Sequence, residues 1–121
     1  MLYKEMIKSV KHYSGLSDEE SKDALGMMVE SISVHLPEPE REDFASELPG
    51  ALHDMALSVS PTTKNSTEDI LQQFMEVQDI DERTARRQIT AAWQTIKEAI
   101  SPGEIRDILA WLPKSSHRIL T

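Results

Sequence analysis

The chain contains no cysteine, only four glycines and few aromatic residues among its 121 positions. The absence of cysteine excludes disulfides, thiolate zinc sites, iron–sulfur clusters and cysteine nucleophiles. Long apolar runs are also missing, because the longest covers only residues 108–112, which is too short to cross a bilayer. The first ten residues hold lysines and no apolar secretory core, so we expect no signal peptide, no membrane partner and a cytoplasmic location.

Acidic residues outnumber basic ones by 21 to 13, which gives a formal charge of −8 at pH 7. The excess is concentrated in residues 1–57, which hold 5 basic and 12 acidic side chains, whereas residues 65–121 hold 7 and 9. An acidic surface repels phosphate backbones, so we expect no nucleic-acid partner. The 39% of hydrophobic residues is typical of an ordinary globular domain.

An internal repeat organises the chain, because a shift of 64 positions aligns residues 1–57 with residues 65–121 without a gap. Apolar positions stay in register, as in the pairing of Leu25 with Ile89. Six aligned pairs are identical: Ile32/Ile96, Glu40/Glu104, Asp43/Asp107, Leu48/Leu112, Pro49/Pro113 and His53/His117. We therefore predict two tandem copies of one folding unit, joined by a linker at residues 58–64 and packed as one domain.

The apolar residues inside each copy recur with helical spacing, as at Leu25, Met28 and Val29, and no segment alternates with the period of a strand. We predict an all-α bundle of two pseudo-symmetric repeats with three or four helices each. The predicted helices cover residues 2–13, 18–35, 39–48, 50–57, 67–77, 82–99, 102–112 and 114–120.

The predicted helix boundaries depend on capping residues and prolines. Residues 17–20 (SDEE) and 101–104 (SPGE) have the pattern of capping boxes, in which a serine and a glutamate each satisfy a backbone N–H of the other. Proline lacks the N–H that a continuing helix requires, so it marks helix ends. Further boundary residues are the N-caps Thr67 and Asp81 and the prolines Pro37, Pro49 and Pro113.

Two stretches resemble motifs of the bacterial family known as domain of unknown function 2267 (DUF2267). Residues 15–20 (GLSDEE) are similar to the cap of its second helix, and residues 99–113 (AISPGEIRDILAWLP) are similar to its I-S-x-G-E-x-x-D-V-x-A-Q-L-P pattern. The chain departs from the family at Pro39, where Gly is usual, and at Trp111, where Gln is usual. The resemblance implies an all-helical, twice-repeated fold and no activity, so it supplies no catalytic residue.

Two acidic pairs recur in both copies, Glu40 with Asp43 and Glu104 with Asp107, each on one helix face. Brought together at the repeat junction, these carboxylates could hold Mg²⁺ or Ca²⁺ and serve a metal-dependent or acid–base enzyme. The simpler interpretation is that acids at helix starts favour the helix dipole, and that Glu104 closes a capping box on Ser101. We favour the simpler interpretation and expect no metal and no other cofactor.

Other candidate residues also have a simple structural interpretation. His53 and His117 recur, yet neither has a second metal ligand at i+3 or i+4, and histidines near helix ends are common dipole partners. The six methionines could form an adaptable binding surface, although we interpret them as core residues. No nucleophile elbow, catalytic triad context or glycine-rich phosphate loop is visible.

Trp111 is the candidate interaction residue that the repeat singles out. It lies on the flank of the apolar stripe of its helix, and its counterpart in the first copy is Glu47, so the position tolerates solvent. A large aromatic residue at such a position is a typical anchor for self-association or for a protein partner. The alternative is that Trp111 folds back over the Pro113 turn or over the other copy.

Three arginines form the other candidate interaction site, since Arg83, Arg86 and Arg87 lie at i, i+3 and i+4 near the start of a helix. They could bind a phosphate or an acidic partner, or pair with Glu82 and the acidic first copy. With no catalytic motif in view, the sequence favours a non-catalytic interaction or structural module over the enzyme alternative.

Overall fold

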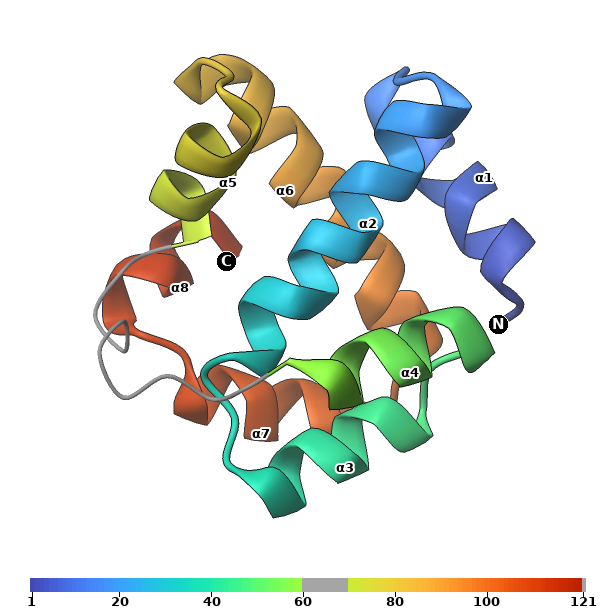
Figure 1. Ribbon diagram of the computed structural model, residues 1–121, viewed down its shortest axis with the longest axis vertical. Helices are drawn as coiled ribbons and strands as arrows, with labels where there is room; N and C mark the ends of the chain where they lie inside the picture. The colour runs from blue at the N-terminus through green and yellow to red at the C-terminus, as the bar shows by residue number, and fades with distance from the viewer. Residues whose placement is uncertain (60–69, 121) are drawn as a thin grey trace.

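The computed structural model describes residues 1–59 and 70–120 (Figure 1). Within these ranges the chain forms eight helices and no strand, which confirms the all-α prediction. The helices are α1 (Tyr3–Ser14), α2 (Asp18–Ser33), α3 (Glu38–Ser46), α4 (Gly50–Ser58), α5 (Ile70–Gln78), α6 (Glu82–Ala99), α7 (Pro102–Trp111) and α8 (Lys114–Leu120). The expected N-cap Thr67 and residues 60–64 of the expected linker lie outside the described residues.

The observed helix ends differ from the predicted ones by at most two residues wherever both are described. The main difference lies ahead of the prolines. We predicted helices to residues 35 and 48, but α2 ends at Ser33 and α3 at Ser46. The last residues before each proline form turns instead, because their N–H groups bond three residues back, as Leu36 does to Ser33 and Leu48 to Ala45, and no longer four residues back as in an α-helix.

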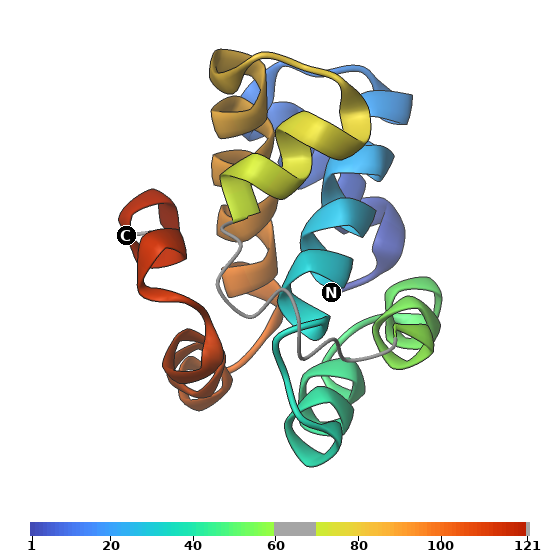
Figure 2. The same ribbon diagram turned by 60° about the vertical axis from the view of Figure 1, so that its left-hand side comes forward.

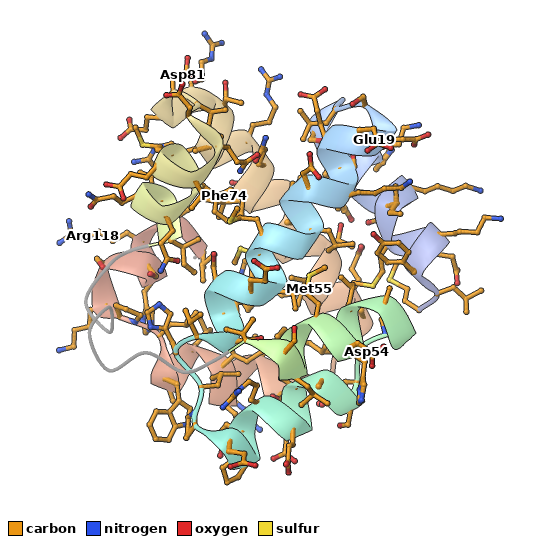
Figure 3. All side chains as sticks on the ribbon, viewed as in Figure 1. Glu19, Asp54, Met55, Phe74, Asp81 and Arg118 are labelled. Atoms are coloured by element: carbon orange, nitrogen blue, oxygen red, sulfur yellow. The ribbon has the colours of Figure 1, made fainter. Side chains whose placement is uncertain are left out.

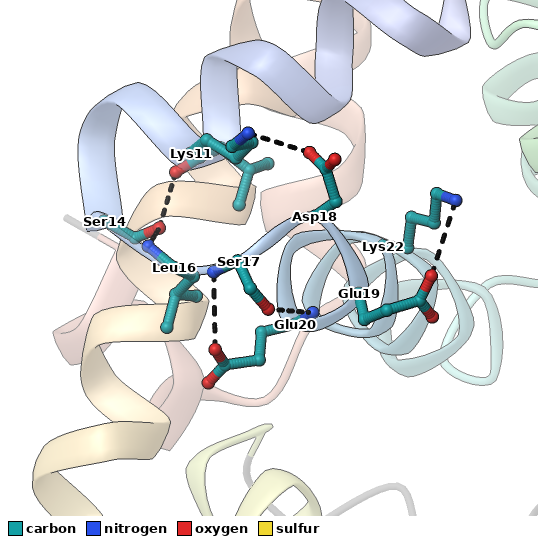
Figure 4. Close-up of polar contacts among 9 residues, drawn as sticks. Lys11, Ser14, Leu16, Ser17, Asp18, Glu19, Glu20 and Lys22 are labelled. Carbon is teal, nitrogen blue, oxygen red and sulfur yellow. Dashed lines mark hydrogen bonds and ion pairs between the residues drawn. The ribbon is translucent and has the colours of Figure 1, made fainter.

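The turn between α1 and α2 shows how local contacts start a helix (Figure 4). The Ser17 hydroxyl accepts a hydrogen bond from the Glu20 N–H at 3.1 Å, and the Glu20 carboxylate accepts one from the Ser17 N–H at 3.3 Å. This reciprocal pair confirms the predicted capping box at Ser17. Across the same turn, the Lys11 ammonium lies 2.9 Å from the Asp18 carboxylate, which links the end of α1 to the start of α2.

The long helices α2 and α6 pack against each other in the centre of the molecule. Helices α1 and α5 lie at one end of this pair, while α3, α4 and α7 lie at the other (Figures 1 and 2). Helix α1 packs on α6 as well as on α2, and α3 packs on α7, so the two halves interleave. One continuous core results, and its largest fully buried side chains include Leu25, Phe44, Phe74, Ile89 and Ile96.

Several local features recur at the offset of 64 residues. Helices α2 and α6 begin at positions 18 and 82, and α3 and α7 begin at positions 38 and 102. The turns before the long helices match as well, because Gly15 and Asp79 both have positive φ, 73° and 52°. Asp is one of the few residues other than glycine that tolerate this left-handed conformation. The two-repeat arrangement itself stays a prediction, which these correspondences support.

Candidate functional site

Glu104 lies where α3 packs against α7, and its side chain is only 6% exposed. The Ser101 hydroxyl accepts a hydrogen bond from the Glu104 N–H at 3.3 Å, as expected for an N-cap. The Ser101 N–H, however, donates to Oε1 of Glu47 at 2.7 Å and not to the Glu104 carboxylate. The predicted capping box at Ser101 is therefore wrong in its second half, because a carboxylate at the end of α3 reaches Ser101 instead.

Burial and nearby negative charge together raise the pKa of Glu104 to about 7. Desolvation is the largest cause, and the carboxylates of Glu47, Asp107, Asp43 and Glu40 add repulsion in decreasing order. Oε1 of Glu104 has no hydrogen-bond partner among the described residues, so this oxygen lacks a donor that would stabilise the charged form. The structure thus brings both predicted acidic pairs into the electrostatic neighbourhood of one buried carboxyl group.

The convergence of these acids does not create a metal centre in the part of the chain that the structure describes. No group of three or more His, Asp or Glu residues within residues 1–59 and 70–120 is placed to hold a metal ion. The carboxylates of this cluster repel one another electrostatically, and among the described residues they do not surround a common point where a metal ion could bind. The chemical capacity of this cluster is to bind or release a proton at Glu104 near neutral pH.

The two recurring histidines make equivalent contacts. Nδ1 of His53 lies 2.8 Å from the Ala45 carbonyl oxygen, and Nε2 of His117 lies 2.7 Å from the Leu109 carbonyl oxygen. In both halves the histidine reaches back eight residues, across the Leu-Pro step, to the last turn of the preceding helix. The carbonyl groups of a last helical turn lack partners within the helix, and each ring supplies a donor to one of them. The Ala45 oxygen also accepts from the Leu48 N–H at 3.0 Å.

The two predicted interaction sites lie at opposite ends of the molecule. Trp111 ends α7 and is 50% exposed, whereas Trp93 of α6 is only 3% exposed. The three arginines follow Asp81, which Figure 3 labels at the end away from α7. Arg83, Arg86 and Arg87 are all exposed, and Arg86 pairs with Glu82 at 3.7 Å. The geometry does not combine these two candidates into one surface.

A hollow that the sequence did not predict runs along α2. It consists of two open cavities of about 330 and 260 Å³ that share Met27 and Glu30 as lining residues. The larger cavity lies between α2 and α5, with Val77 in its wall. The smaller one includes Met55 of α4, which Figure 3 labels beside α2. We call this surface the α2 hollow.

Two methionine side chains contribute to the apolar lining of the α2 hollow. Met27 and Met55 are partly buried and line it, although we had interpreted the methionines as core residues. That interpretation holds for Met6 and Met28, which are fully buried. A Cβ atom at Gly26 would lie 3.3 Å from the Met55 side chain, so this glycine leaves room for Met55 against α2. Flexible thioethers adapt to differently shaped partners, which suits a binding surface.

The comparisons with known proteins give a family and no activity. The family model described as "Uncharacterized conserved protein (DUF2267)" matches residues 3–119. A search of curated proteins finds no match to the chain. Among the described helices, none has both the length and the apolar character that a membrane crossing requires.

Proposed function

Because the chain belongs to the uncharacterized DUF2267 family, whose description names no activity, we propose its molecular function from the geometry of its surface. The proposal is a non-catalytic interaction module that binds a protein partner in the α2 hollow. It includes the cytoplasmic location and the bacterial origin expected from the sequence and the resemblance.

The observation that carries this proposal is a concave surface lined by one exposed and three half-buried apolar side chains. Val77 is 69% exposed although it is apolar, and it lines the same cavity as Met27 and Val34. Met55 extends the apolar lining toward α4. Apolar side chains grouped in a hollow with a polar rim are characteristic of surfaces that bind peptide segments.

The enzyme alternative has one observation in its favour, the raised pKa of Glu104. A perturbed carboxyl group is typical of acid–base catalysts, yet structural clusters perturb pKa values as well. Glu104 lines neither cavity of the α2 hollow, and the acids near it do not form a metal-holding group among the described residues. We therefore assign Glu104 and its neighbours to the packing of α3 against α7.

A matched pair of variants tests the proposal. Val77→Glu places a charge in the hollow, while Trp111→Glu places the same charge on a half-exposed apolar residue outside it. Partners captured from the natural host by the wild-type protein are identified by mass spectrometry and purified, and their binding to each variant is measured by calorimetry. We expect Val77→Glu to weaken binding about tenfold or more and Trp111→Glu to leave it unchanged. A partner that still binds Val77→Glu but no longer binds Trp111→Glu would refute the hollow as the binding surface.

A further inference from the structure

We propose that the α2 hollow binds an amphipathic helix whose polar face is basic. This inference rests on the proposed function and adds the chemistry of the partner. Three properties of the described residues support it: the length of the hollow, its apolar lining and the sign of the charge around it.

The length of the hollow suits a short helix. Its lining extends from Lys22 on α2 to Val34, the residue that follows this helix, which corresponds to roughly 18 Å along the helix axis. A partner helix of about three turns has the same length. Met55 of α4 and Val77 of α5 lie on the other walls, so a partner would contact three helices at once.

The apolar residues of the hollow match the apolar stripe of such a helix. Met27, Val34 and Val77 line one cavity, and Met27 and Met55 line the adjoining one. Met27 belongs to both and thus joins the two parts into one apolar surface. An amphipathic helix presents residues at i, i+3, i+4 and i+7 to a groove of this kind.

The rim of the hollow is acidic and largely uncompensated. Asp23, Glu30 and Glu76 are exposed lining residues, and none of them forms an ion pair within residues 1–59 and 70–120. The Glu76 carboxylate accepts a hydrogen bond from the neutral Gln72 amide, which leaves its charge in place. Lys22 is the one basic residue among the described lining residues, and it already pairs with a carboxylate outside the hollow, 3.7 Å away.

This charge pattern decides between partners. A second copy of this chain also carries −8, so docking of a like-charged copy on an acidic rim is unfavourable. A helix with lysine or arginine beside its apolar stripe would place cations against Glu30 and Glu76. Complementary charge steers such a partner to the hollow and disfavours acidic ones.

Three synthetic peptides of about 14 residues provide the probes. The first has leucines at i, i+3, i+4 and i+7 with lysines elsewhere, the second has glutamates in place of the lysines, and the third is a scrambled version of the first. Affinity is measured by fluorescence anisotropy, and the contact surface by the NMR shifts of methyl-labelled methionines. Met27 and Met55 report on the hollow, while the fully buried Met6 and Met28 serve as internal controls.

We expect the lysine peptide to bind about ten times more tightly than the other two and to shift mainly the Met27 and Met55 methyl signals. The double variant Glu30→Gln/Glu76→Gln should weaken this binding by about tenfold and make it less sensitive to salt. The matched control Glu38→Gln/Glu42→Gln removes two exposed charges from α3, outside the hollow, and should change the affinity less than about twofold. Circular dichroism of both double variants verifies the fold.

Three results would overturn the inference. If the two double variants weaken binding equally, the attraction belongs to the whole acidic surface and not to the rim. If the glutamate peptide binds more tightly than the lysine peptide and shifts the Met27 and Met55 signals, the hollow binds helices with an acidic polar face. The proposed function then stands without this inference. If the lysine peptide leaves both signals unchanged, the inference fails, and retained partner binding by Val77→Glu would then refute the proposed function separately.

Discussion

Glu47, at the end of α3, accepts two hydrogen bonds from Ser101 at the start of α7. The Ser101 N–H lies 2.7 Å from Oε1 of Glu47, and the Ser101 hydroxyl lies 3.3 Å from Oε2. At the offset of 64 residues, Glu47 corresponds to Trp111 and Ser101 to Pro37. Because proline has no N–H to donate, the contact has no equivalent in the other half, and the junction of the halves is asymmetric at this point.

The first prediction concerns this contact. Glu47→Ala should lower the free energy of unfolding by about 1 kcal/mol, because α7 loses the acceptor for its N-cap N–H. Urea unfolding at about pH 5.5 measures the effect while Glu104 is protonated and feels little repulsion from Glu47. Glu42→Ala, at an exposed position of the same helix, is the control and should change stability by less than about 0.5 kcal/mol. Equal effects of the two substitutions would contradict the capping role.

The second prediction concerns pH. The pKa of Glu104 is about 7 in the folded protein and near 4.5 when the chain is unfolded, so the folded state holds this proton more tightly. Its contribution therefore makes the protein most stable below about pH 4.5 and lowers stability as the pH rises to about 7, by at most about 3 kcal/mol. Glu104→Gln should remove this loss and be more stable than wild type at about pH 8. Urea titrations of both proteins across this range check it, and parallel pH profiles would refute it.

The third prediction concerns Trp111. Trp111→Glu introduces the residue found at the equivalent position of the first half, and because Trp111 is 50% exposed the helical fold should be retained. If Trp111 anchors self-association, the substitution should shift the monomer–oligomer equilibrium toward monomer in a sedimentation-velocity concentration series. Circular dichroism and thermal unfolding serve as controls for the fold. Unchanged sedimentation would rule out this anchor, and an unfolded variant would place Trp111 in the core.

The fourth prediction concerns the two halves. Helix α1 packs on α6, so a fragment of residues 1–64 would expose apolar side chains that α6 covers in the intact chain. Each fragment, 1–64 or 65–121, should be largely unfolded alone, because about 60 residues bury too little surface without their partner. An equimolar mixture should regain helical circular dichroism. A fragment that unfolds cooperatively by itself would show that the halves are independent domains.

Helix positions could be predicted from the sequence because they depend on neighbouring residues. The serine at position 17 and the glutamate at position 20 lie one turn apart, and their capping box forms as predicted. The prolines at 37 and 49 also act locally, although they end the helices slightly earlier than predicted. Fold class and helix order therefore follow from short-range chemistry.

The contacts between halves could not be predicted in the same way. Glu104 has the correct spacing for a capping box on Ser101, but only the packing of α3 against α7 brings Glu47 within reach of that serine. The α2 hollow was missed for a related reason. Methionine is an apolar residue type that is common in protein cores, so the sequence does not distinguish Met27 and Met55 from core residues. Their partial exposure depends on how far α4 and α5 lie from α2.

The histidine contacts fix the position of two protons. A ring nitrogen that faces a carbonyl oxygen must carry hydrogen, so the neutral rings are opposite tautomers, Nδ1–H in His53 and Nε2–H in His117. Each ring therefore joins two helices across a Leu-Pro step, His53 between α3 and α4 and His117 between α7 and α8. The same helix corner is thus closed in both halves by one imidazole N–H, from Nδ1 in the first half and from Nε2 in the second.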